Sequence, residues 1–142
     1  MFICNSFRPA AEIKWYGFND GYALSKKKKK LMLIDVYTDW CGWCKRMDRD
    51  TYMFGEVVEF VNKDFIAIKF NPELQATYNY EGKQLNGMEL RNFLGDNKIT
   101  GYPATIFAHP KTNKRKLIIG YRNPDQMKAE LSGAVAELSS KK

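Results

Sequence analysis

The sequence has few of the residues that cross-link or ligate small proteins. Its 142 residues include only three cysteines and one histidine. Three cysteines are too few for the disulfide framework of a small secreted scaffold. The sequence has no second cysteine pair that would complete a zinc site with Cys41 and Cys44, so we expect no metal. The alternative is that these two cysteines form half of a zinc site.

Long apolar runs are also missing. A bilayer-spanning helix needs about 20 apolar residues, and the longest apolar runs here are interrupted by Asp35 and Lys69. We therefore expect no stable membrane insertion. The composition, 44% hydrophobic and 14% aromatic, is instead typical of a folded globular protein. At this length we expect one α/β domain over residues 13–142, preceded by a flexible segment over residues 1–12.

That first segment has its own ambiguity. Residues 1–6 are apolar and small, and are similar to the tail of an export signal whose charged start is missing. Cys4 remains outside the motif discussed below. A lipid anchor on Cys4 is disfavoured because the bulky Ile3 precedes it, and a disordered terminus is the simpler interpretation.

Positive charge exceeds negative charge, with a formal net charge of +7. Five of the positive charges form one block, Lys26–Lys30. Lysines suit the negative end of a helix dipole, so we interpret the block as a solvated helix end and expect no nucleic-acid partner. A patch for an anionic surface is the alternative.

Apolar periodicity predicts alternating strands and helices. We expect strands at 13–16, 31–37, 65–70, 104–108 and 116–121, and helices starting at Asn19-Asp20, at Gly42, near Val57, near Met88 and after Asn123. Asn123, Pro124 and Gln126 have the spacing of a capping box with proline at the first helical position. Residues 72–87 have mixed polarity, so we expect an irregular excursion there, with one helical turn at 74–78 as an option.

One motif stands out from this background. Cys41 and Cys44 lie two residues apart in Trp40-Cys41-Gly42-Trp43-Cys44-Lys45, directly after an apolar strand. Free N–H groups at a helix start stabilise a thiolate, so we expect Cys41 to be an exposed nucleophile. Cys44, one turn later, would resolve the mixed disulfide. A disulfide that never turns over stays an alternative.

The two residues between the cysteines complete this picture. Gly42 would let a substrate backbone approach, and Trp43 would add an apolar contact surface. Haem attachment would require histidine after Cys44, where Lys45 stands.

The chain resembles the thioredoxin superfamily, and most closely its small exported bacterial thiol:disulfide interchange members. Trp40–Lys45 matches the Trp-Cys-Gly-x-Cys-Lys motif, and Asp35 lies where the family has a buried acid. Lys69, the segment 101–105 and Gly120 match three further family positions. The likeness runs from about residue 15 to 138. It implies a three-layer fold, with a central mixed β-sheet and helices on both faces.

The resemblance also implies roles. Asp35, with a raised pKa, would exchange a proton with Cys44, and Lys69 would modulate it. Trp40 and Tyr102 would contact the substrate, with a cis bond before Pro103. Each of these roles has an alternative. Asp35 would be a structural acid paired with another group, Lys69 would extend to solvent, and Trp40 would be an aromatic residue of the core. Trp43 replaces the usual proline, so the strongly reducing potential of the family does not carry over.

We therefore expect a thiol:disulfide oxidoreductase, specifically a protein-disulfide reductase that needs no cofactor. Its partners would be disulfide-containing proteins and an upstream thiol electron donor. The alternatives are a non-catalytic binding module with the same fold and a disulfide oxidase or isomerase. The resemblance favours the periplasm, and a cytoplasmic location is the alternative.

Overall fold

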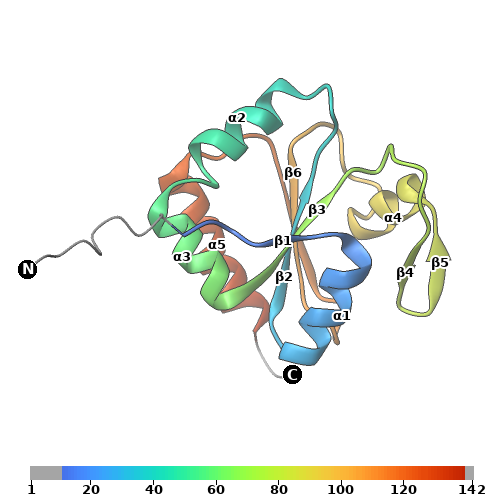
Figure 1. Ribbon diagram of the computed structural model, residues 1–142. Helices are drawn as coiled ribbons and strands as arrows, with labels where there is room; N and C mark the ends of the chain where they lie inside the picture. The colour runs from blue at the N-terminus through green and yellow to red at the C-terminus, as the bar shows by residue number, and fades with distance from the viewer. Residues whose placement is uncertain (1–10, 140–142) are drawn as a thin grey trace, which may run out of the picture.

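The computed structural model describes residues 11–139, so the expectations for Cys4 and for residues 1–10 lie outside it. Its main sheet has five strands in the order β1-β3-β2-β6-β7. Strands β1, β3 and β2 pair in parallel, whereas β6 and β7 are antiparallel to their neighbours. Figure 1 shows helices on both sides of this sheet. The expected three layers and mixed sheet are confirmed.

The elements agree with the sequence pattern except where stated below. In chain order they are β1 (Trp15–Tyr16), α1 (Phe18–Lys28), β2 (Leu31–Val36), α2 (Gly42–Asp50), α3 (Gly55–Asp64), β3 (Phe65–Phe70), β4 (Tyr78–Tyr80), β5 (Lys83–Leu85), α4 (Gly87–Leu94), β6 (Ala104–Ala108), β7 (Arg115–Ile119) and α5 (Pro124–Leu138). None of the helices between residues 11 and 139 is long and apolar enough to cross a membrane.

The central strand β2 is buried along its whole length because both of its faces are covered. Leu31 and Leu33 belong to a core with α3 and α5, whereas Met32 and Ile34 belong to a second core with α1 and α4. Side chains alternate along a strand, so Asp35 points to the same side as Leu33. This is the side on which Met47 of α2 joins the core.

The excursion at 72–87 is irregular only over residues 72–77, and the helical turn at 74–78 is absent. Strands β4 and β5 form a two-stranded hairpin. Glu81 and Gly82, its two loop residues, both have positive φ, as the tight turns that suit hairpin twist require. Tyr78 and Tyr80 alternate inward and pack on Phe18, which explains why a polar-looking segment is ordered.

Asn19 does not cap α1, contrary to the sequence expectation. The helix begins at Phe18 after Gly17, without a side-chain cap. The Asn19 side chain instead donates to the Thr77 carbonyl and accepts from the Asn79 backbone N–H. It therefore ties α1 to the hairpin. At α5 the predicted capping box of Asn123 and Gln126 is confirmed, with Pro124 at the helix start.

Candidate active site

A disulfide joins Cys41 and Cys44 where the loop after β2 enters α2. Their Cα atoms are 5.3 Å apart, within the usual disulfide range. Cys41 is the N-cap of α2, and its Sγ accepts a hydrogen bond from the Cys44 N–H at 3.1 Å. This places the first sulfur among the free donors of the helix start, as the spacing predicted.

The expectation that Cys41 is exposed is wrong for this disulfide form. Cys41 is 5% exposed and Cys44 3%. Both cysteines of the disulfide are therefore buried. The flanking indoles are the accessible groups: Trp40 is 67% exposed and Trp43 54%. Trp40 is therefore not a core aromatic.

Trp40 is held in place by groups from the segment after β3 and the loop before β6. Its Nε1–H donates to Glu73 Oε1 at 3.1 Å, and its ring meets the edge of Tyr102 at 5.9 Å between centroids. Tyr102 is fixed in turn by Arg91 of α4, whose Nε–H donates to the tyrosine oxygen at 2.8 Å. Arg91 also donates to the Ile99 carbonyl, which anchors the approach to Pro103.

The peptide bond between Tyr102 and Pro103 is cis. Trp43, Tyr102, Gly120 and Tyr121 line a hollow of about 340 Å³. Nothing lies within 4 Å of where a side chain on Gly42 would begin, so the surface above that residue is open. The hollow is therefore lined by Trp43 from between the two cysteines and by Tyr102 from the residue before the cis proline.

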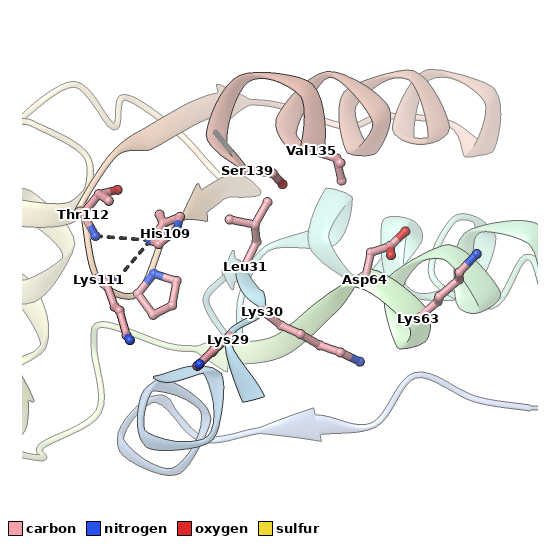
Figure 2. A pocket seen from close by; sticks show the side chains of 11 residues that line it. Lys29, Lys30, Leu31, Lys63, Asp64, His109, Lys111, Thr112, Val135 and Ser139 are labelled. Atoms are coloured by element: carbon pink, nitrogen blue, oxygen red, sulfur yellow. Dashed lines mark hydrogen bonds between the residues drawn. The ribbon is translucent and has the colours of Figure 1, made fainter. Parts of the chain in front are cut away.

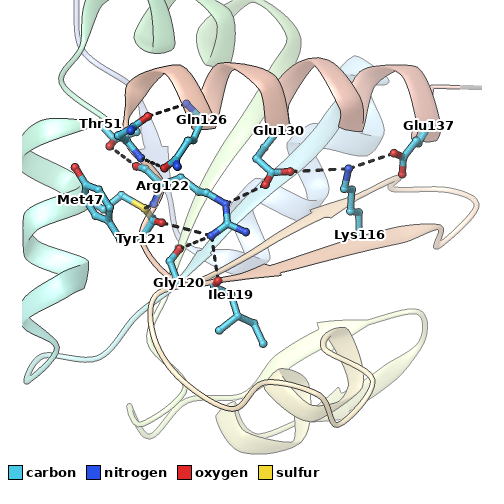
Figure 3. Close-up of polar contacts among 11 residues, drawn as sticks. Met47, Thr51, Lys116, Ile119, Gly120, Tyr121, Arg122, Gln126, Glu130 and Glu137 are labelled. Atoms are coloured by element: carbon cyan, nitrogen blue, oxygen red, sulfur yellow. Dashed lines mark hydrogen bonds and ion pairs between the residues drawn. The ribbon is translucent and has the colours of Figure 1, made fainter.

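Residues of α2 and α5 anchor the loop that carries Gly120 and Tyr121 (Figure 3). Thr51, at the end of α2, donates its hydroxyl to the Arg122 carbonyl at 2.6 Å. The Arg122 guanidinium pairs with Glu130 of α5 and donates to the Ile119 carbonyl. Helices α2 and α5 therefore fix the wall of the hollow relative to the disulfide.

Asp35 lies on the α2 side of the sheet and is 1% exposed. Lys69 of β3, its register partner, lies with Nζ 2.7 Å from Asp35 Oδ2. The same ammonium lies 2.6 Å from Asp48 Oδ1 on α2. It also stands 4.9 Å from each of the Trp15 and Tyr37 ring centroids. Lys69 therefore pairs with Asp35 and does not simply extend to solvent.

Burial dominates the electrostatics of this cluster. Loss of solvation raises the pKa of Asp35 from 3.8 to about 6, although the neighbouring Lys69 charge opposes the rise. Burial lowers the pKa of Lys69, but the two carboxylates outweigh it, so that pKa is raised overall. Asp35 is thus the acid of the cluster that can gain or lose a proton near neutral pH.

Two buried hydroxyls lie near the same carboxyl group. Thr105 is the register partner of Asp35 across the β2–β6 pair, and burial together with the Asp35 charge raises the pKa of Tyr52 well above its usual value. Asp35 Oδ1 and both hydroxyls have no hydrogen-bond partner among the described residues. The unshared Oδ1 leaves Asp35 with proton-accepting capacity beyond its ion pair.

Sequence reasoning missed Asp48, Glu73 and Arg91. Asp48 lies four residues after Cys44, so helix periodicity places it on the same side of α2, and this was the available signal. Glu73 and Arg91 carry no local signal, because their contacts reach 33 and 11 residues along the chain.

Comparisons with known proteins agree with this picture. Residues 8–139 match the family model Thioredox_DsbH, described as a protein of unknown function, DUF255. An uncharacterized protein of Archaeoglobus fulgidus is 33% identical over 54 residues, which are 38% of this chain and 42% of that relative. The chain thus spans less than half of the length of this relative.

Solved structures show the fold. A DsbH oxidoreductase has a TM-score of 0.67 at 18% identity, over 96% of this chain and 95% of that one. A thioredoxin from Thermus thermophilus has a TM-score of 0.68 at 15% identity, over 89% and 90%. A putative disulphide-isomerase from Bacteroides thetaiotaomicron has a TM-score of 0.66 at 22% identity, over 92% and 98%.

Proposed function

The chain belongs to the Thioredox_DsbH (DUF255) family, and from this membership and the site geometry we propose that it is a thiol:disulfide oxidoreductase acting on protein disulfides. The observation that carries the proposal is the Cys41–Cys44 disulfide at the start of α2, on the side of the sheet where the buried Asp35 also points. A helix start lowers the cost of a thiolate, and the nearby acid can handle a proton.

The proposed reaction starts from the reduced dithiol. The Cys41 thiolate attacks a substrate disulfide, which forms a mixed disulfide and releases one substrate thiolate. Cys44, deprotonated with the help of Asp35, then attacks the Cys41 sulfur. This step releases the second substrate thiol and forms the Cys41–Cys44 disulfide, so the substrate gains the two electrons that the dithiol loses. A thiol donor must return two electrons for another cycle.

Burial supports the assignment of Asp35 as the proton-exchanging group. A carboxyl whose pKa is about 6 is partly protonated near neutral pH and can therefore both accept and return a proton. Lys69 modulates this pKa, and Asp48 modulates Lys69 from the helix that carries the cysteines.

The aromatic rim of Trp40, Trp43 and Tyr102 supports binding of protein substrates. Trp40 and Trp43 flank the disulfide in sequence and are exposed, Tyr102 packs against Trp40, and the surface above Gly42 is open. We propose that an extended substrate segment binds across this surface, beside Gly42 and Tyr102.

We propose reduction in the periplasm as the direction and place of action, on the strength of the family resemblance. Oxidation or isomerisation would use the same atoms and differ only in the potential of the couple. A difference of about 30 mV in the reduction potential of the Cys41–Cys44 couple corresponds to roughly 1.4 kcal/mol for two electrons. Equilibrating the couple with glutathione measures this potential and so separates reduction from oxidation or isomerisation.

Reduction of insulin with dithiothreitol as donor tests the proposal. The experiment uses a Cys4→Ser background, so that only the motif sulfurs can react. We expect turnover in this background and loss of turnover in Cys41→Ser. Equal rates with and without Cys41 would mean that the chain is a binding module and not an oxidoreductase.

A further inference from the structure

A second hollow, of about 530 Å³, lies at the opposite end of the sheet from the disulfide. It is next to Leu31, where β2 begins, whereas β2 ends at Val36 before the loop to Cys41 (Figures 1 and 2). Its volume is within the range of small-molecule sites. Leu31 and Val135 supply apolar lining, and the turns around them supply charge.

The charge around this hollow is almost all positive. Lys29 and Lys30 enter from the turn after α1, Lys63 from the end of α3 and Lys111 from the turn between β6 and β7. Asp64 is the one acid in the lining. Figure 2 shows the side chains of these lysines extending in different directions from the elements around Leu31.

In the described part of the chain, the four lysines of the hollow are not neutralised by carboxylates, although Lys30 Nζ donates to the Asn62 carbonyl at 3.5 Å. Lys69, Lys116 and Lys128 each form ion pairs with carboxylates. Within residues 11–139, no ion pair involves the four lysines of the hollow. Unpaired ammonium groups beside an apolar floor generate a stronger field than the same groups in open solvent.

Helix ends do not cancel this field. The C-termini of α1, α3 and α5 meet here, and each contributes about half a negative charge. Lys114, on the same turn as Lys111 and beside His109, adds to the four lysines of the hollow. After the helix ends and Asp64 are subtracted, a surplus of roughly two positive charges remains.

His109 stabilises the turn that carries Lys111. Its Nδ1 accepts hydrogen bonds from the backbone N–H groups of Lys111 and Thr112, at 3.1 and 3.2 Å. Burial first, and then the fields of Lys114 and Lys111, lower the pKa of His109. The imidazole is therefore neutral at pH 7 and acts as a fixed acceptor that holds one wall in place.

We propose that this hollow binds a phosphate-bearing ligand. Its cations are lysines, which bind phosphate as point charges, and its lining contains no arginine of the kind that pairs with carboxylates in a two-pronged way. The hydroxyls of Thr112 and Ser139 lie at its edge as further donors, and the apolar floor suits an organic group attached to the phosphate. The site is separate from the disulfide and does not depend on the proposed redox activity.

The test is an amide NMR titration of the full oxidised chain with sodium pyrophosphate at constant ionic strength. We expect saturable shifts at Leu31 and at residues 109–112. The double variant Lys30→Gln/Lys111→Gln should bind at least about tenfold more weakly, since each ammonium contributes several-fold to the binding of a nearby anion. The control, Lys83→Gln/Lys98→Gln, removes the same charge elsewhere and should bind like the unmodified chain.

A second arm identifies the source of the phosphate. Cosedimentation with phosphatidylglycerol vesicles but not with phosphatidylcholine vesicles, lost in Lys30→Gln/Lys111→Gln, would assign a lipid headgroup. Saturation by pyrophosphate without cosedimentation would assign a free ligand, and either result supports the site. Equal binding by the two double variants, shifts that never saturate, or tighter binding of a hexaglutamate peptide than of pyrophosphate would overturn it.

Discussion

Replacement of Asp35 by asparagine should make the protein more stable and less active. The native fold buries this carboxyl, and its pKa rises from 3.8 to about 6 as a result. A group that binds its proton more tightly when folded stabilises the fold at low pH and loses that contribution as the pH rises between the two values. Ionised Asp35 therefore destabilises the native state above about pH 6.

The magnitude follows from linkage. One unit of pKa corresponds to about 1.4 kcal/mol, so the difference between 3.8 and about 6 is worth about 3 kcal/mol at pH 8. At pH 4 the same relation leaves only about 0.5 kcal/mol, because Asp35 is then largely protonated in the native state and partly protonated in the unfolded state. Lys69 keeps Asp48 as a partner in the variant, so no unpaired charge is created.

Urea unfolding of oxidised Asp35→Asn and of the unmodified chain at pH 8 and pH 4 measures both values. Asp50→Asn, a more exposed change on α2, is the control and should alter stability by about 0.5 kcal/mol or less at either pH. An equal gain at both pH values, or a loss at pH 8, would refute the reasoning. In the same variant, insulin reduction should slow by roughly tenfold to a hundredfold, since the proton acceptor is lost.

Three further changes test other contacts. Asp48→Asn removes a negative charge that raises the pKa of the buried carboxyl, so the pH midpoint of turnover should move down, whereas Asp50→Asn should leave it in place. Arg91→Met removes the donor that fixes the tyrosine of the aromatic rim; the KM for insulin should rise several-fold while reduction of a small disulfide reagent stays within about twofold. Gly87→Ala places a methyl group against the Pro72 carbonyl and should destabilise the protein by about 1–3 kcal/mol in urea, whereas Gly55→Ala meets open space and should not.

The sequence predicted most of the fold because its elements are strongly patterned. The buried strands at 31–37 and 65–70 were found from continuous apolar runs, and α5 from its capping residues. The β4–β5 hairpin was missed because its strands have three residues each, too few for a period of two to be recognised. Its stability comes from tyrosines that pack on Phe18, a contact far away in sequence.

The same distinction applies to the site. Cys41 and Cys44 were identified from local spacing and Asp35 from the family resemblance, and the structure places them at the start of α2 and on the strand face that α2 covers. The burial of Cys41 was not predictable, since accessibility depends on the groups that surround the finished disulfide. Glu73 and Arg91 were not predictable either, because their partners are brought together only by the folded chain.

The order of reaction of the two sulfurs is the claim on which the proposed function depends. Reduced Cys44→Ser and Cys41→Ser, both in the Cys4→Ser background, are mixed with oxidised glutathione, and the adducts are mapped by mass spectrometry over time. The account predicts a rapid, persistent glutathione adduct on Cys41 in Cys44→Ser and a slow one on Cys44 in Cys41→Ser. Equal rates for the two sulfurs, or a faster adduct on Cys44, would contradict it.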